Sequence, residues 1–493
     1  MKKLTDFIKK NRTEFWLLVI ILAVGAFLRL YDLNDSMHFA NDEGRDAFVV
    51  KSIVEGEELP LLGPAAPNNR PDFHLGPAFY YLLAPFFWLS GSDPVGGAYL
   101  VALLSIASLF LIYYLGKKLF DRWVGLLAAF LMATNFLMIR YSRWTWNPHP
   151  VPFFILLLLL ALWKLHRGKQ NYLILLAISL GFIIQLHGTA LFVLPVFLVV
   201  YWIIFRPKIK WQKWLLATVC FLIVISPLII YDLQNNLANT KGFFRILGQS
   251  DSQGALPLWQ KIDKSYLSFH GFWDELTMNN RLQFLSALLI IGILAWLLTK
   301  NYQKISAKEK SYHYSVLALW FFIPLLIFIF YKEQIPPHYY SLIYPLCFLL
   351  IAAFLIWLLQ QKHLKIITGL ILLTVITTNL FFVTHHFIDL EYSGSRANSH
   401  SVIIEEQRKV TDYIADDIGN HQFNFYSEPS QYYDQAYLYL LSLKGIEPSF
   451  YNEAIGYVVL NPKGLALTEN WDGANIIESN DFGNVRVLKI KND

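Results

Sequence analysis

The chain has 493 residues, of which 55% are hydrophobic and 16% are charged, whereas soluble domains carry about 25% charged residues. The formal net charge of +5 is too small to indicate nucleic acid as a partner. The apolar residues gather in long runs, among them the uncharged segment 15–28, and a helix needs about 20 such residues to cross a bilayer. Composition therefore predicts an α-helical polytopic membrane protein and excludes one large soluble core.

Hydropathy along the chain predicts eleven transmembrane helices. A further apolar stretch, 77–91, is short and is interrupted by Pro77 and Pro85. If this stretch lies on the outer interface, the cytoplasmic segments together hold 21 of the 41 basic residues and only three acids, as the positive-inside rule requires. If it crossed the membrane, the basic loops would face opposite sides. The predicted spans are 14–31, 95–116, 123–139, 150–165, 172–187, 189–205, 214–231, 283–299, 312–331, 340–360 and 364–385.

This topology places the N-terminus in the cytoplasm and the first loop, 32–94, outside the plasma membrane, with 77–91 as an interfacial helix. The membrane domain is expected to span 1–388. Beyond it the pattern becomes mixed, and 389–493 is predicted to form a soluble α/β domain on the outer side. Its expected elements are helices at 402–418 and 431–443 and strands at 422–426, 457–460 and 485–490.

Adjacent carboxylates, Asp42 and Glu43, follow the first predicted span. Adjacent carboxylates near a bilayer raise each other's pKa, which favours a general base or a metal site. Arg45, two residues later, is a candidate for phosphate binding. The alternative is a solvated loop whose acids cap a helix that begins near Ala47. The spacing alone leaves both interpretations open.

Further polar clusters lie at the outer ends of the predicted spans. Segment 140–150 combines two arginines, two tryptophans, an asparagine and a histidine; tryptophan faces stack on sugars and arginine binds phosphate. The alternative is interface anchoring by aromatic and snorkelling side chains, which also applies to 331–340, while a Pro/Gly turn would explain 69–77. The candidate substrate-binding residues are Asp72, His74, Trp144, Asn147, His149, His338 and Tyr339, and the further phosphate-binding candidates are Arg143 and Lys332.

Four sequence blocks, in this order and on one side of the membrane, resemble the GT-C glycosyltransferases. The resemblance is closest to family 39, which holds the protein O-mannosyltransferases and the lipid A aminoarabinose transferase. The blocks are Asp42-Glu43-Gly44-Arg45, residues 76–85, residues 125–143 and residues 338–345. The resemblance covers roughly residues 10–350 and implies the GT-C fold with about eleven transmembrane helices.

The resemblance also implies a reaction. Such enzymes transfer a hexosyl or pentosyl group from a polyprenyl-phosphate donor to a protein, lipid or glycan acceptor outside the cytoplasm. By analogy Asp42 is the general base that deprotonates the acceptor hydroxyl, and Glu43 is a second catalytic candidate. The leaving group is a phosphate, which needs charge stabilisation; the candidates for this role are Arg45, Arg143 and Lys332.

Some family members hold a divalent metal near the first outer loop. The candidate ligands here are Glu43, His74 and His187, although His187 at the end of a predicted span is more often a packed residue than a ligand. Many members also carry an acid five residues after the second-loop arginine, where this chain has Pro148 flanked by Asn147. A second catalytic carboxylate is therefore not expected at that position.

The main alternative function is that of a transporter or a flippase for lipids or polysaccharides, and the second is that of a membrane scaffold for the C-terminal domain. A transporter places charged residues or broken helices near mid-membrane, often in two repeated halves. Here the predicted spans are nearly free of charge, and the polar residues gather at their outer ends. This distribution favours an enzyme whose partners are the lipid-linked donor, the acceptor and the membrane lipids.

Overall fold

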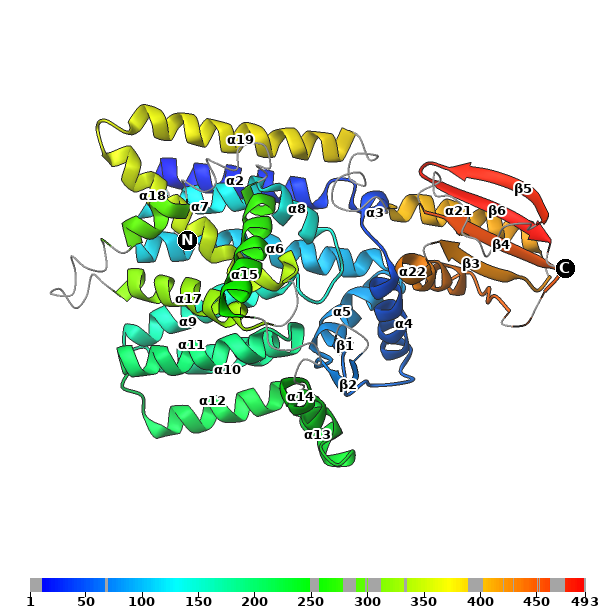
Figure 1. The fold of residues 1–493 in the computed structure, drawn as a ribbon, viewed down its shortest axis with the longest axis horizontal. Coiled ribbons are helices and arrows are strands. Elements are labelled where there is room, and N and C mark those ends of the chain that lie inside the picture. Colours follow the sequence, from blue (N-terminus) through cyan, green and yellow to red (C-terminus); the bar gives the residue numbers. More distant parts are fainter. Residues whose placement is uncertain are drawn as a thin grey trace.

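The computed structural model describes most of the chain, and all structural statements below concern these residues. They are 11–66, 70–248, 257–277, 290–297, 299, 312–331, 335–388, 402–419, 421–428, 430–449, 451, 453–461 and 475–491. The long apolar helices lie side by side in one bundle, and a small domain with a sheet lies at one end of it (Figure 1).

The bundle is built from helices that coincide with the predicted spans. They are α2 (Arg12–Leu30), α6 (Val95–Leu119), α7 (Arg122–Thr134), α8 (Phe136–Ser142), α9 (Val151–His166), α10 (Tyr172–Leu186), α11 (Ala190–Phe205), α12 (Trp211–Val224), α13 (Ser226–Gln234), α17 (Tyr312–Ile329), α18 (Tyr344–Gln360) and α19 (Lys365–Ile388). The eighth predicted span, 283–299, is described only over 290–297 and at residue 299.

By length and composition, four described helices can cross a membrane: α2, α6, α17 and α19. The number of spans rises to as many as six if each bent helix pair is counted as one span. Helix α5 (Ala78–Leu89) has 12 residues and is therefore about 18 Å long, well short of an apolar layer of about 30 Å. A polytopic helical membrane fold is confirmed, while the number eleven and the orientation in the membrane remain predictions.

Two of the predicted spans are broken. Helices α7 and α8 meet at an angle of 63°, and helices α12 and α13 meet at 65°. A break frees backbone carbonyl groups, which must be satisfied within the protein because the hydrocarbon layer offers no water. Arg29 does this at the first break: its Nη1 and Nη2 donate to the carbonyls of Ala133 (2.9 Å) and Met132 (3.0 Å).

Other side chains complete this joint. Asn379 of α19 accepts the N–H of Phe136 at 3.0 Å, and Arg29 Nε donates to Ser105 Oγ of α6 at 2.8 Å. Arg29 is fully buried, so its aliphatic stem and its charged head both lie inside the bundle. Side chains from three neighbouring helices therefore fix the bend.

The first outer loop contains short elements that sit between the bundle and the small domain. They are α3 (Leu33–Ser36), α4 (Asn41–Glu55), α5, and strands β1 (Ala65–Ala66) and β2 (Arg70–His74), which pair antiparallel. The loop 232–282 adds two helices that the sequence analysis did not predict, α14 (Ala238–Gly248) and α15 (Leu258–Thr277). The short 3-10 helix η1 (Pro337–Leu342) leads into α18.

The C-terminal domain combines two helices, α21 (Ile404–Ile418) and α22 (Ser430–Ser442), with a four-stranded sheet of order β3-β4-β6-β5. Its strands are β3 (Asn424–Glu428), β4 (Ile455–Leu460), β5 (Asn475–Phe482) and β6 (Val485–Lys491). Strand β3 is parallel to β4, and the other pairs are antiparallel. Every predicted element of the domain has a counterpart, and β5 is additional.

One face of this sheet packs on both helices. Val410 and Ile414 of α21 and Tyr437 of α22 share a buried apolar core with Val459 and Val487 of the sheet. The amphipathic pattern that predicted α21 therefore matches its role, because its apolar stripe covers the sheet. The α/β character expected of this region is confirmed.

The joint at Arg29 predicts a stability effect. Arg29→Leu leaves two buried carbonyls without a donor, and each such group costs about 1–3 kcal/mol. We expect the free energy of unfolding to fall by roughly 2–4 kcal/mol, with a lower melting temperature in detergent. Arg12→Leu, at the exposed first residue of the same helix, is the matched control. Equal melting temperatures for Arg29→Leu and wild type would contradict the role of this joint.

Candidate active site

Helix α4 begins at Asn41, six residues before the start that the helix-capping alternative gave it. Asp42 and Glu43 lie in its first turn, where the helix dipole favours negative charge. Glu43 also fixes the start locally, because its Oε2 accepts the N–H of Ala40 at 2.8 Å, as in a capping box. Both carboxylates thus lie in the first turn of a helix, the position that the helix-capping alternative gives to acids.

Arg45 joins an exposed acid to a buried one. Its Nη1 lies 2.8 Å from Asp42 Oδ1, and its Nη2 lies 2.7 Å from Asp46 Oδ1. The side chains of Asp42 and Arg45 are 47% and 41% exposed, whereas that of Asp46 is only 2% exposed. Tyr80 of α5 donates its hydroxyl to Asp46 Oδ1 at 3.1 Å, so Asp46 anchors the arginine to the membrane domain.

Burial raises the pKa of Asp46 to about 6, against the opposing effect of the adjacent Arg45 charge. Asp46 Oδ2 has no hydrogen-bond partner among the described residues, which adds to the cost of its ionised form. Asp42 and Arg45 remain the charged pair at the surface of this site.

Glu43 has a different environment from its neighbour Asp42. It is 3% exposed, and its Oε1 accepts the indole N–H of Trp144 at 2.5 Å. Burial, reinforced by the charge of Asp42, raises the pKa of Glu43 to about 8. Glu43 therefore connects the start of α4 to the second outer loop, with both oxygens engaged.

Beyond Trp144 lies a contiguous set of aromatic rings and imidazoles, here called the histidine cluster (His38, Trp144, Trp146, His149, His187, His338 and Tyr339). Trp144 stacks on Trp146 with centroids 5.0 Å apart, and Trp146 reaches His338 at 4.5 Å. Burial lowers the pKa of His38 and His149 to about 3 and that of His338 to about 4. These imidazoles are neutral near pH 7, so the cluster offers rings and neutral hydrogen-bonding groups.

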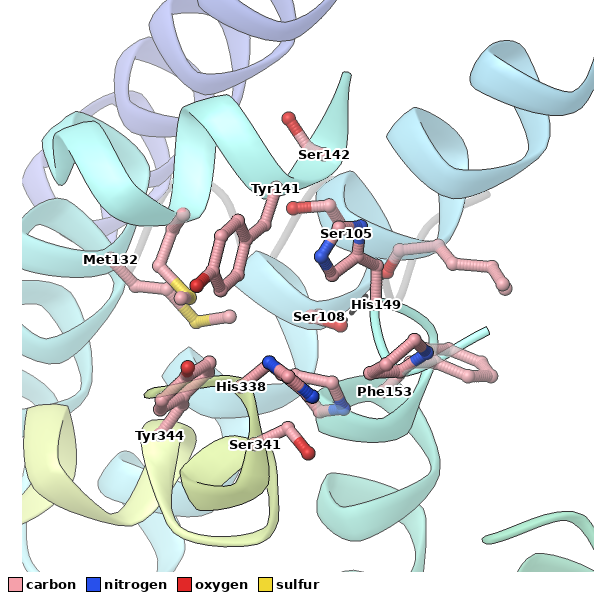
Figure 2. A pocket seen from close by; sticks show the side chains of 14 residues that line it. Ser105, Ser108, Met132, Tyr141, Ser142, His149, Phe153, His338, Ser341 and Tyr344 are labelled. Atoms are coloured by element: carbon pink, nitrogen blue, oxygen red, sulfur yellow. Dashed lines mark hydrogen bonds between the residues drawn. The ribbon is translucent and has the colours of Figure 1, made fainter. Parts of the chain in front are cut away.

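A cavity lies beside His149 and His338 of this cluster, and Figure 2 shows the side chains around it. Tyr141, His149, His338 and Tyr344 face it, with Ser341 at one side. Two polar atoms at the cavity, His149 Nε2 and Ser341 Oγ, have no partner among the described residues. The space holds about one water molecule, which is too little for a sugar ring.

The structure brings together some of the predicted site residues. Asp42, Glu43 and Arg45 meet at the start of α4, and Glu43 contacts Trp144. The remaining members of this group, joined through ring contacts, are His149, His338, Tyr339 and His187.

Arg143 lies apart from this group. It is buried and donates to the carbonyls of Tyr31 (2.7 Å) and Asp32 (3.3 Å) and to the hydroxyl of Ser36. These contacts tie the end of α8 to the chain that leaves α2. They give no support to the predicted phosphate-binding role.

Other predicted residues also make structural contacts. Asn147 Nδ2 donates to the carbonyl of Leu186 at 2.7 Å, which fixes the second outer loop to the end of α10. The backbone of His74 pairs with the side chain of Asn239. Lys332 and the side chain of Asp72 lie outside the described residues.

The predicted metal ligands do not form a site. No three His, Cys, Asp or Glu side chains in the described part of the chain lie close enough together to hold a metal ion. Both Glu43 oxygens accept hydrogen bonds, and His187 Nδ1 accepts the N–H of Thr189 at 3.3 Å. Among the described residues, Glu43, His74 and His187 are therefore not assembled into a metal site, and a divalent metal stays a prediction.

Sequence analysis missed several members of the site. Asp46 follows Asp42 by four residues, so the two side chains lie on the same face if both belong to one helix. A predicted helix start at Asn41 would therefore have indicated that Asp46 lies near Asp42. Tyr80 and Trp146 are also absent from the predicted set, although they lie in the segments 76–85 and 140–150. His38, in the first outer loop, is absent as well. A single aromatic or histidine residue at a membrane edge can either belong to a functional site or anchor the protein at the interface. The sequence does not distinguish these two roles.

Comparisons with solved structures bear on the fold of the chain. The crystal structure of ArnT from Cupriavidus metallidurans in the apo state is similar over 96% of this chain and 97% of that one, with a TM-score of 0.59 and 12% identity. The crystal structure of ArnT bound to undecaprenyl phosphate is similar over 97% of this chain and 98% of that one, with a TM-score of 0.59 and 13% identity. The chain therefore has the fold of ArnT, and the fold that the resemblance of the sequence blocks implies is confirmed.

Two further comparisons bear on the family. The archaeal oligosaccharyltransferase AglB from Archaeoglobus fulgidus, in complex with an inhibitory peptide and a dolichol-phosphate, has a TM-score of 0.52 at 12% identity. It is similar over 84% of this chain, which spans 59% of AglB. The dolichyl-phosphate-mannose-protein mannosyltransferase family matches residues 70–231, from β2 to α13, a stretch that begins after α4. A search of curated protein sequences found no match.

The environment of Glu43 predicts a pH effect on stability. Because its pKa rises from 4.5 to about 8 on folding, the folded chain binds more protons than the unfolded chain between these values. Stability should fall as pH rises through this range and level off above it. Glu43→Gln removes this contribution, so the difference in melting temperature between wild type and variant should change from pH 5 to pH 8. Parallel pH profiles for the two proteins would contradict this environment.

Proposed function

We propose that this protein transfers a sugar from a polyprenyl-phosphate donor to an acceptor on the outer face of the membrane. The observation that carries the proposal is the Asp42–Arg45 pair, held at the rim of a GT-C fold by buried Asp46. Support also comes from the ArnT complex with undecaprenyl phosphate, which is similar over 97% of this chain. The N-terminus would then lie in the cytoplasm and the C-terminal domain outside.

The proposed reaction is a displacement at the anomeric carbon of the donor sugar. Asp42 takes the proton of the acceptor hydroxyl, whose oxygen bonds to the anomeric carbon while the bond from this carbon to the phosphate oxygen breaks. The polyprenyl phosphate leaves as the anion. Asp42 is suited to this role because its carboxylate is half exposed and therefore open to an acceptor hydroxyl.

Arg45 is the group proposed to stabilise the leaving phosphate. Three of its N–H groups are used, one toward Asp42 and two toward Asp46. A guanidinium has five N–H donors, so two remain for a phosphate oxygen. The hydrogen bonds to Asp46 fix the guanidinium before the substrate arrives, and such preorganisation makes electrostatic stabilisation effective.

The bent spans favour the alternative of a transporter, since broken helices often mark transport sites. The break between α7 and α8 is, however, filled by Arg29 and Asn379, which make hydrogen bonds to the freed backbone groups. The freed backbone groups at this break are therefore already satisfied by protein side chains. The enzyme remains the better supported function.

The general-base role predicts the effect of Asp42→Asn. The amide keeps the size of the side chain but cannot take the proton, so kcat should fall by about 10²–10⁴-fold with an unchanged melting temperature. Transfer is measured from a radiolabelled polyprenyl-phosphate sugar with the protein in nanodiscs. Asp35→Asn, at an exposed carboxylate of the same loop, is the control. Transfer by Asp42→Asn at the wild-type rate would rule out the mechanism.

The bridging role of Arg45 predicts that lysine cannot replace it. A single ammonium cannot form the forked contact to Asp42 and Asp46 and also bind phosphate. Arg45→Lys should lower kcat by about 10²-fold or more. It should also weaken binding of the donor, measured as a higher KM for the lipid-linked sugar. A variant with wild-type kcat and KM would exclude Arg45 from the leaving-group site.

A further inference from the structure

The first turn of helix α4, which carries Asp42, contacts the C-terminal domain. At Gly44, two residues after Asp42, an added Cβ would lie 2.3 Å from the backbone carbon of Gln435 and 2.4 Å from the backbone nitrogen of Ala436. These distances are far below any Cβ contact, so α4 and α22 approach so closely that only glycine fits. The neighbouring atoms are helix backbone, which cannot move aside as a flexible side chain can.

A hydrogen bond fixes the two helices in register at the same place. Asn41 Oδ1 accepts the backbone N–H of Gln435 at 3.0 Å. Asn41 is the residue immediately before Asp42, and its side chain is the link between the first turn of α4 and the middle of α22. Asp42 is therefore flanked on both sides by contacts with the C-terminal domain.

The surrounding interface is buried and apolar. The ring of Tyr439 on α22 meets Phe48 of α4 edge-on at 5.0 Å, and its hydroxyl donates to the carbonyl of Ser92 at 2.6 Å. Ala436, Tyr439 and Leu440 belong to the same buried apolar core as the membrane helices. The two predicted domains therefore share a core at this place.

Helix α21 adds polar contacts around this core. Gln407 Nε2 donates to the carbonyl of Phe39 at 2.8 Å, and the N–H of Ile404 donates to the carbonyl of Met37 at 3.2 Å. Arg408 pairs with Asp93, with Nη2 2.8 Å from Oδ2. The chain just before α4 is thus held by the C-terminal domain as well as by the membrane domain.

We propose that α22 is a positioning element of the active site, and that Gly44 and Asn41 are the positioning residues through which it sets the place of Asp42. The inference rests on the proposed function for its catalytic part. A 15-residue helix is marginal without tertiary contacts. Helix α4 has such contacts on two sides, Asp46–Tyr80 toward α5 and Gly44–Gln435 toward α22.

Small displacements matter here because a misplacement of about 1 Å at a catalytic group costs about 10²-fold in rate. If α22 is pushed away from Gly44, the first turn of α4 moves with Asp42 and the Arg45 contact loosens. Asp46 still holds Arg45, the proposed phosphate-binding group, so this change affects kcat more than the donor KM. The C-terminal domain therefore acts on the chemical step without touching the substrate.

The first test is Gly44→Ala in the full-length protein in nanodiscs. We expect kcat to fall about 10–100-fold with a donor KM within about threefold of wild type, and faster amide hydrogen exchange in 41–55. Gly369→Ala is the matched control, because that glycine also lies in a helix and has open space around its Cβ position. Alanine favours helix over glycine, so a loss at position 44 reports the contact with α22.

The second test separates positioning from a general loss of folding. Asn41→Ala removes the acceptor for the Gln435 N–H, whereas Asn41→Asp keeps an acceptor oxygen. The alanine variant should lose kcat and exchange protection in α4, and the aspartate variant should restore both. Equal losses in the two variants would overturn the role of this hydrogen bond.

Wild-type kcat in Gly44→Ala would overturn the proposal as a whole. If exchange in α4 were faster at the same time, α22 would contact α4 without positioning Asp42. If the wild-type protein released no polyprenyl phosphate, the proposed function would fail. The exchange measurements on Gly44→Ala and Asn41→Ala would still decide whether α22 holds α4.

Discussion

Helix α4 packs so closely on α22 that no side chain fits at Gly44. This contact determines much of the architecture around the site. It brings the C-terminal domain onto the rim of the bundle, and it places Asn41 and Asp42 beside the domain boundary. On the opposite side, Asp46 accepts hydrogen bonds from Arg45 and Tyr80. The charged pair of the site is thus held between two packed surfaces, with only the outer part of Asp42 and Arg45 exposed.

The bilayer imposes a second constraint, which explains the arginines that do not join the site. Broken spans and chain ends leave carbonyl groups that only protein donors can satisfy. Arg29 serves those of the α7–α8 break, and Arg143 serves those that follow α2. Both arginines are buried in this role. Among the arginines considered for phosphate binding, Arg45 alone combines exposure with N–H groups left for a ligand.

Hydropathy and charge predicted the helical bundle, because each span carries its own signal. The elements of the C-terminal domain were also predictable, except β5, whose residues Asn475–Phe482 are mostly polar and exposed. Side-chain partners were not predictable. An arginine at a membrane edge can donate hydrogen bonds either to a phosphate or to backbone carbonyls. Which of these Arg143 binds depends on how the chain folds around Ser36. The surroundings of Glu43 were not predictable for the same reason, since Trp144, one of its two partners, lies far away in sequence.

The central claim is that the lipid-linked sugar is cleaved and its sugar transferred. The direct measurement uses the purified full-length chain in liposomes, with a polyprenyl-phosphate donor labelled separately in its sugar and its phosphate. The account predicts that the sugar label moves to the acceptor while the phosphate label stays with the lipid. Movement of both labels together across the bilayer, without cleavage, would contradict it and identify a transporter.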